Sequence, residues 1–182
     1  NNISQDFYLN IRNEYKNSNI IKTFSSEAVI MMNDKAKGVL VRGIDTNQID
    51  EIKLFNNNNI IDGTILNFKQ NTVVIGKQLA IELGVVVGDR INIMSSTSSS
   101  TLLGLVPKQS VYKIVSVFSS GLYDYDRNVV FFTINDSFSF FEKSENDIVL
   151  EMYVKDPLNA DIYKGEIPVS YTHLRAHETR IH

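Results

Sequence analysis

The sequence predicts a mixed α+β protein in which strands dominate the middle of the chain. In two segments, near residues 4–17 and 73–84, apolar residues recur every three or four positions, as they do on one face of a helix. Several other stretches are rich in Val, Ile and Phe or alternate apolar with polar residues, which is typical of strands. The chain has 182 residues, 43% of them hydrophobic, and can bury a core as one domain or two small ones.

The first half of the chain is predicted to hold a helix, a hairpin and a second helix. In "SQDFYLNIRNEYKN" apolar residues lie four positions apart, which predicts the first helix. "NIIKTFSSEAVIMM" and "KGVLVRGI" predict the two strands of a hairpin, because the polar "NDK" separates them. "VVIGKQLAIELG" predicts the second helix, and its Gly84 stands where a helix end often needs a left-handed residue.

The second half is predicted to be mainly β. "RINIM" alternates as a half-buried strand does, and "SSTSSST" at 95–101 predicts a flexible polar arm. "VYKIVSVF", "NVVFFTI" and "DIVLEMYV" predict three further strands. "NDSFSFF" predicts a helix capped by Asn135 or Asp136, and "DPLNADIYKGEI" predicts a last helix with Pro157 in its first turn.

Composition excludes several classes of function. The net charge is -3 and no basic cluster is present, so nucleic acid is not an expected partner. The chain has no cysteine, which excludes disulfides and thiolate metal sites. No apolar run approaches the roughly 20 residues that a membrane-spanning helix needs.

One pair of carboxylates is a candidate for acid–base chemistry. "YDYDR" at 123–127 puts Asp124 and Asp126 on one face of a predicted strand, beside Arg127. An enzyme built on this pair requires both carboxyls to lie in a cleft with raised pKa values. The simpler interpretation is a solvent-facing strand edge or turn with a charge partner, and we expect both groups to be exposed. No nucleophile elbow or phosphate-binding motif accompanies them, so no catalytic site is predicted.

"STLLGLVPKQS" places apolar residues at the end of the serine-rich arm. An arm of Ser and Thr buries little, so these residues either fold back onto the core or stand exposed as a docking site. Gly104 and Pro107 favour a bent, projecting loop over a continuous strand.

Three segments in series resemble one family. "GVLVRGID" (38–45), "VVIGKQLAIELGVVVGDRINI" (73–93) and "LLGLVPKQSVYKIVSVFSSGLYDYD" (102–126) are similar to the periplasmic region of lipoprotein-releasing ABC transporter permeases of the LolC/LolE type, whose wider relatives are the MacB-like permeases. The resemblance implies two lobes in a chain truncated at both ends. An incomplete porter-like α/β lobe comprises residues 1–44 and 149–167, and an inserted β-rich lobe comprises 45–148 with a hook loop at 95–110.

The resemblance also implies a function. The chain is expected to be the periplasmic part of an inner-membrane permease that releases lipoproteins and hands them to a LolA-like periplasmic carrier through the hook. ATP hydrolysis is expected in a separate cytoplasmic subunit, so the chain itself is not an enzyme and needs no cofactor; a second permease subunit is a further expected partner. The family leaves open a C-type, an E-type or a self-pairing permease. The hook positions are Leu102, Leu103, Gly104, Leu105, Val106, Pro107 and Lys108.

The hook departs from the family in one respect, because some members have proline and methionine where this chain has Leu102 and Leu103. Two alternatives to the lipoprotein-releasing function stay open. A MacB-like efflux permease shares the two lobes but needs no hook, since its partner is an adaptor protein. A freestanding periplasmic binding module requires that no membrane spans flank the chain.

The tail holds every histidine of the chain. His173 and His177 lie four apart beside Glu178, a spacing typical of zinc sites, and His182 follows. Residues 169–179, however, match one reading frame of a common sequencing-library adapter. We therefore expect 168–182 to be a non-native tail and predict no metal site.

Overall fold

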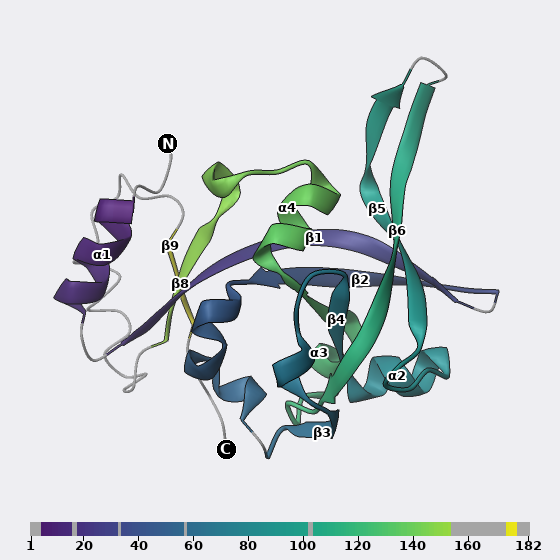
Figure 1. Ribbon diagram of the computed structural model, residues 1–182, viewed down its shortest axis with the longest axis horizontal. Coiled ribbons are helices and arrows are strands. Elements are labelled where there is room, and N and C mark those ends of the chain that lie inside the picture. Colours follow the sequence, from purple (N-terminus) through teal and green to yellow (C-terminus); the bar gives the residue numbers. More distant parts are fainter. Residues whose placement is uncertain are drawn as a thin grey trace. The chain divides into compact units, whose positions relative to one another are not determined.

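The computed structural model describes residues 5–15, 18–32, 34–56, 58–101, 104–153 and 174–177 (Figure 1). Contacts divide the chain into two units. The first comprises Asn1–Thr23 and Ser144–His182, and the second comprises Phe24–Lys143. The mixture of helices and strands, mostly strands, confirms the predicted α+β class.

In the first unit, helix α1 (Gln5–Glu14) lies beside the beginning of strand β1 (Asn19–Met32). Its buried face carries Tyr8 and Ile11, and Tyr15 is buried just after the helix ends. The Tyr8 hydroxyl donates to the carbonyl of Ile20 at 3.4 Å. The periodicity that predicted this helix reflects a real buried face.

Strand β8 (Val149–Tyr153) runs antiparallel to the beginning of β1, and β9 (Leu174–His177) runs parallel to β8. A short 3-10 helix, η4 (Glu145–Asp147), precedes β8, and Ser144 caps it. The helix predicted from "DPLNADIYKGEI" lies outside the described residues.

The second unit is a closed ring of strands. Its members are, in order, β2 (Lys35–Ile44), β7 (Val129–Thr133), β4 (Thr72–Gly76), β6 (Gly104–Phe118), β5 (Arg90–Thr101) and the end of β1. An additional pairing of β2 with β1 closes it. The β2–β7 and β4–β6 pairs are parallel, and the short strand β3 (Ile60–Gly63) pairs with β6 off the ring.

The two faces of the ring strands belong to different hydrophobic clusters. Along β4, Val73 and Ile75 join the cluster that includes helices α2 (Lys77–Leu83) and α4 (Ile134–Phe141). Val74 joins the second cluster, which includes the 3-10 segments η1 (Thr46–Glu51), η2 (Lys53–Phe55) and η3 (Ile65–Asn67). Both faces of β4 are therefore buried, which explains the apolar run at 73–75. The helix predicted over 73–84 was wrong in its first part, because 73–76 belong to β4 and the helix begins only at Lys77.

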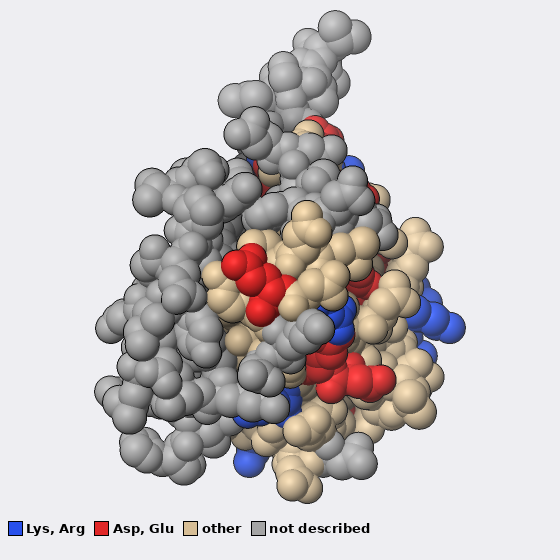
Figure 2. Space-filling view, turned by 90° about the vertical axis from the view of Figure 1, so that its left-hand side faces the viewer, with Lys and Arg blue, Asp and Glu red and all other residues tan. Residues whose placement is uncertain are grey.

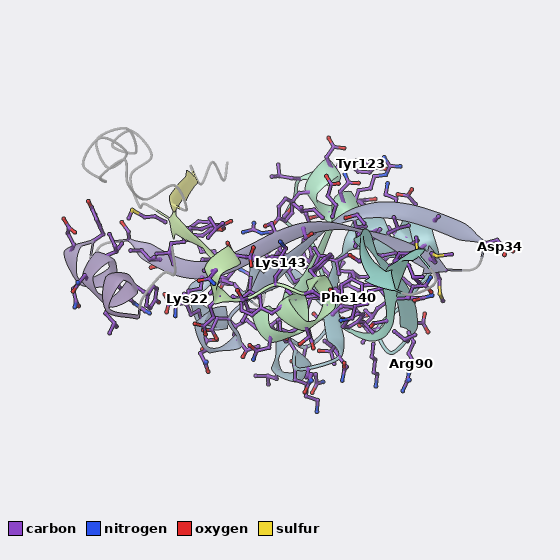
Figure 3. The ribbon with its side chains drawn as sticks, turned by 90° about the horizontal axis from the view of Figure 1, so that it is seen from above. Lys22, Asp34, Arg90, Tyr123, Phe140 and Lys143 are labelled. Atoms are coloured by element: carbon purple, nitrogen blue, oxygen red, sulfur yellow. The ribbon has the colours of Figure 1, made fainter. Side chains whose placement is uncertain are left out.

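The helix ends show where the sequence was informative. Gly84 ends α2 with φ 71°, as predicted, and its N–H donates to the carbonyls of Ala80 and Ile81. The cap predicted for α4 was wrong by two or three positions, because Thr133 is the N-cap and its hydroxyl accepts from the N–H of Asp136 at 3.1 Å. Figure 3 shows Phe140 of α4 among the core side chains.

The predicted lobes, 1–44 with 149–167 and 45–148, stay a prediction. The structure places β2, which that division gives to the porter-like lobe, in the ring of the second unit. No helix in the described part of the chain is long and apolar enough to cross a membrane.

Candidate partner-binding site: the β5–β6 arm

The outer part of the β5–β6 hairpin extends beyond every neighbouring strand of its unit (Figure 1). Strand β1 pairs with β5 only as far as Ser95, and β4 pairs with β6 only from Lys113 onward. The two strands nevertheless continue to pair with each other, from Ser98 opposite Pro107 to Thr101 opposite Gly104. We call the segments 98–101 and 104–107 the arm.

The arm is a regular two-stranded ribbon, so the predicted flexible segment at 95–101 and the predicted bent loop were wrong in form. Serine-rich sequence has little strand propensity of its own, but each strand of a hairpin supplies the other's backbone hydrogen bonds. Pro107 is compatible with this ribbon because no third strand pairs beside it in the described part of the chain.

A bulge separates the arm from the ring. Met94 lies opposite Gln109, but the next recorded pair is Ser98 with Pro107. Residues 95–97 of β5 therefore stand opposite Lys108 alone. Bulges bend a ribbon and increase its twist, so this one sets the direction in which the arm leaves the ring.

Two side chains in the bulge bond to elements outside the hairpin. The Ser96 hydroxyl donates to the carbonyl of Glu27 on β1 at 2.7 Å. The Lys108 ammonium donates to the carbonyl of Ser139 in the last turn of α4 at 2.5 Å. Sequence reasoning missed both contacts, because neither partner is near in sequence and a backbone carbonyl leaves no side-chain signal.

The structure describes the predicted hook residues unequally. Leu102 and Leu103 lie outside the described residues, and for Gly104 and Leu105 it gives only the backbone, in β6. Val106 is 50% exposed. Pro107 and Lys108 are half-buried, and Lys108 is the residue bonded to α4.

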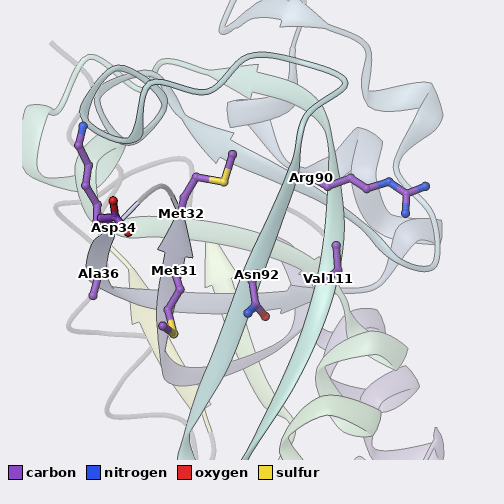
Figure 4. A pocket seen from close by; sticks show the side chains of 8 residues that line it. Met31, Met32, Asp34, Ala36, Arg90, Asn92 and Val111 are labelled. Atoms are coloured by element: carbon purple, nitrogen blue, oxygen red, sulfur yellow. The ribbon is translucent and has the colours of Figure 1, made fainter.

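An open groove of about 440 Å³ lies near the base of the hairpin (Figure 4). Met31, Asn92 and Val111 lie in one cross-strand row over β1, β5 and β6, and Met31 and Val111 are 41% and 55% exposed. The sequence analysis did not find it, although the alternation of exposed Val111 with buried Tyr112 carries a signal. The lining residues are Met31, Met32, Asp34, Lys35, Ala36, Arg90, Asn92 and Val111.

The candidate carboxylate pair is not a pair. Residues 123–128 form helix α3 (Tyr123–Asn128), not the predicted strand, so Asp124 and Asp126 point in different directions. Asp124 is exposed, but Asp126 is 3% exposed, contrary to the expectation that both face solvent. Tyr123 points outward at the start of the helix (Figure 3).

Asp126 closes a turn instead of serving chemistry. Its carboxylate accepts hydrogen bonds from the Ser119 hydroxyl at 3.1 Å, from the Ser120 N–H at 2.8 Å and from the Ser120 hydroxyl at 2.6 Å. All three donors come from the loop that precedes α3. The arrangement supports the non-catalytic interpretation of this segment.

Arg127 pairs with α2 rather than with its neighbours in sequence. It donates to both carboxylate oxygens of Glu82, at 2.8 and 3.1 Å, and the Lys37 ammonium lies 3.4 Å from the same group. The Arg127 hydrogen bond is the main cause that lowers the pKa of Glu82, and the same bond raises the pKa of Arg127. The bridge joins α3 to α2 at the surface.

The metal prediction is not tested by the described residues. Among them, no group of three or more His, Asp or Glu side chains is placed to hold a metal ion. His173 and His182 lie outside the described residues, and of His177 only the backbone is described, in β9.

In the described part of the face shown in Figure 2, acidic and basic side chains are interspersed among uncharged ones.

No protein-family model matches the chain. It is 27% identical over 113 residues to the lipoprotein-releasing system transmembrane protein LolC of Xylella fastidiosa (strain 9a5c), a match that covers 61% of this chain and 27% of that protein. It is 27% identical over 146 residues to the LolC of Buchnera aphidicola subsp. Acyrthosiphon pisum (strain APS), covering 79% of this chain and 36% of that protein. The chain is thus similar to LolC proteins over 61% and 79% of its length.

A solved structure supports the fold of this LolC-like domain. The extracellular domain of the noncanonic ABC-type transporter YknZ from Gram-positive bacteria superposes with a TM-score of 0.55. The match covers 88% of this chain and 78% of that one at 13% sequence identity, so it speaks to the fold alone. The LolC-like domain spans only 27% and 36% of the two LolC proteins it matches.

Proposed function

We propose that this LolC-like domain is the periplasmic part of an inner-membrane ABC transporter permease that hands lipoproteins to a LolA-like carrier through the β5–β6 arm. The observation that carries the proposal is the arm itself. It extends beyond the neighbouring strands, and its sequence joins a serine-rich strand to the apolar segment 102–107. Val106, the apolar side chain of this segment whose exposure is described, is 50% exposed, which favours a partner.

The two relatives support this proposal, because both are named as transmembrane proteins of a lipoprotein-releasing system. A permease of this kind depends on a cytoplasmic ATPase subunit and a second permease subunit, and we assign these partners to the whole protein. The lipoprotein cargo is its substrate.

Substitution of Leu103 by Asp tests the arm as the carrier site. A charge at the end of the arm makes burial of this position against a carrier unfavourable, so we expect Leu103→Asp to abolish carrier binding. Binding of the LolA-like protein of the same source is measured by calorimetry, and thermal unfolding checks that the domain is folded.

Leu66→Asp is the matched control, because Leu66 is 90% exposed on η3 and lies outside the arm. It should bind the carrier as the parent does. Undiminished binding by folded Leu103→Asp refutes the carrier site on the arm. If the parent binds an adaptor protein and no carrier, the MacB-like efflux function replaces the proposed one.

A further inference from the structure

We propose that Ser96 and Lys108 are positioning residues that fix the direction of the arm, by bonding its base to β1 and to α4. The sequence resemblance makes Lys108 a residue that contacts the carrier. The geometry points instead to a role within the domain, since its ammonium group is bonded to a backbone carbonyl of the same unit.

The bulge is where such a constraint acts. Residues 95–97 lie opposite Lys108 alone, so the regular ladder is interrupted between the ring and the arm. A two-stranded ribbon held by its own ladder alone can bend at an interruption of this kind. Ser96 and Lys108 stand on the two strands of this interruption.

The Ser96 bond extends the attachment of β5 to β1. The last recorded pair between these strands is Ser95 with Ala28. The Ser96 hydroxyl reaches the carbonyl of Glu27, one residue further along both strands, at 2.7 Å. A side chain thus provides a lateral bond just past the end of the backbone ladder.

The Lys108 bond attaches β6 to α4. Ser139 lies in the last turn of this helix, whose terminal carbonyls have no partner within the helix and attract a cation. The helix is a firm support, because Phe140 and Phe141 are buried in the core cluster of the ring. The ammonium group is therefore held against an element that does not belong to the hairpin.

A small change at the base becomes a large displacement at the end of the arm. At about 3.3 Å per residue, the five steps from Ser96 to Thr101 place the end roughly 16 Å from the base. A tilt of about 20°, similar to the twist between neighbouring strands, moves it by roughly 5 Å. The hydrogen bonds of Ser96 and Lys108 can therefore determine the position of the end of the arm.

The direction of the arm can be measured without a partner. The chain has no cysteine, so spin labels attach only where a cysteine is introduced. We would introduce Ser100→Cys on the arm and Asn135→Cys on the exposed face of α4. Pulsed electron paramagnetic resonance gives the distribution of distances between them. We expect one narrow distribution in the parent, and a broadened or shifted one in Lys108→Met, in Ser96→Ala and most of all in the double variant.

Conservative and remote substitutions separate positioning from general disturbance. Lys108→Arg keeps a cationic donor and should restore the narrow distribution. Lys113→Met removes an exposed lysine further along the same strand, and Ser25→Ala removes an exposed hydroxyl on β1; both should match the parent. Thermal unfolding confirms the fold, and the single variants decide the question if the double variant does not fold.

The inference fails if the double variant keeps the parent distribution, or if Lys113→Met broadens it as much as Lys108→Met does. The positioning role rests on the proposed function for one consequence only: carrier binding should weaken when the bonds of Ser96 and Lys108 are removed. If the arm loses its direction but the parent binds no carrier, the positioning role stands and the proposed function fails. If Leu103→Asp abolishes carrier binding but no variant at Ser96 or Lys108 changes the distance distribution, the proposed function stands and the positioning role fails.

Discussion

At the residue scale, buried polar side chains accept hydrogen bonds that the sequence does not reveal. Asp126 and Asp136 are 3% and 5% exposed, and both accept backbone N–H groups, from Ser120 and from Asn71. The segment "YDYDR" was predicted to be a strand, but it lies in helix α3, where Asp126 accepts three hydrogen bonds. Side-chain acceptors for distant N–H groups are set by tertiary contacts, which a single sequence does not encode locally.

Asp136 should make stability depend on pH. Burial raises the pKa of its carboxyl, while hydrogen bonds from the Asn71 N–H and with Thr133 lower it. Burial, and after it the charge of Asp136, raises the pKa of Tyr112. A carboxyl whose pKa is raised on folding contributes stability below its unfolded pKa of about 3.9, and this contribution is lost as pH rises through the folded pKa. We expect Asp136→Asn, which keeps an acceptor for Asn71, to remove this loss.

The measurement is urea unfolding at a series of pH values from about 3 to 8, a range that covers the unfolded pKa of the carboxyl. The Asn variant should gain stability relative to the parent as pH rises. Asp124→Asn is the control at an exposed carboxylate of a neighbouring helix and should leave the profile unchanged. A constant difference between parent and Asp136→Asn across the range contradicts the assignment.

At the element scale, the sequence succeeded where the signal is local. The end of helix α2 at Gly84 followed from one cap residue, but its start did not, because the apolar residues at 73–75 fit a buried strand as well as a helix. The strand 98–101 did not, because it is a strand only through its partner in β6. Projection of the 102–107 segment was argued from composition, and its function as a hook stays a prediction.

The contact of α3 with β4 depends on a glycine. A Cβ on Gly76 would collide with the backbone of Asp126, while a Cβ on Gly38, in β2, meets nothing within 4 Å. We expect Gly76→Ala to destabilise the domain by about 1–3 kcal/mol or more, because backbone atoms must move, and Gly38→Ala to be neutral or slightly stabilising. Chemical denaturation of the two variants, side by side, checks this. Equal stabilities would show that α3 can shift away from β4 without cost.

At the scale of the whole molecule, the ring of the second unit was not predictable from the sequence. The pairing of β2 with β1 confirms the hairpin predicted from local patterns, but the pairing of β2 with β7 joins segments that no local rule connects. The α+β class followed from composition and periodicity, whereas closure follows from the sum of long-range pairings. The placement of β2 in this ring, rather than with residues 1–23, is the clearest example.

Strand β6 should respond to substitutions according to the burial of each position. Ile114 is fully buried inside it, and Val111, three residues earlier on the same strand, is 55% exposed. Ile114→Ala should lower the free energy of unfolding by about 2–5 kcal/mol, since it leaves a cavity. Val111→Ala should change it by less than about 0.5 kcal/mol. Similar losses in thermal unfolding would contradict the difference in burial between Val111 and Ile114.

Closure of the ring also has a consequence for the order of folding. Leu40 of β2 pairs with Val129 of β7, so the ring cannot close until the chain has been synthesised beyond residue 133. Earlier hairpins form within short segments, but the closing step must bring distant segments together and is slowed by the entropy of the intervening loop. Nascent chains that end before β7 therefore leave β2 and β4 without a common neighbour, and the second unit becomes resistant to proteolysis only near the end of its synthesis.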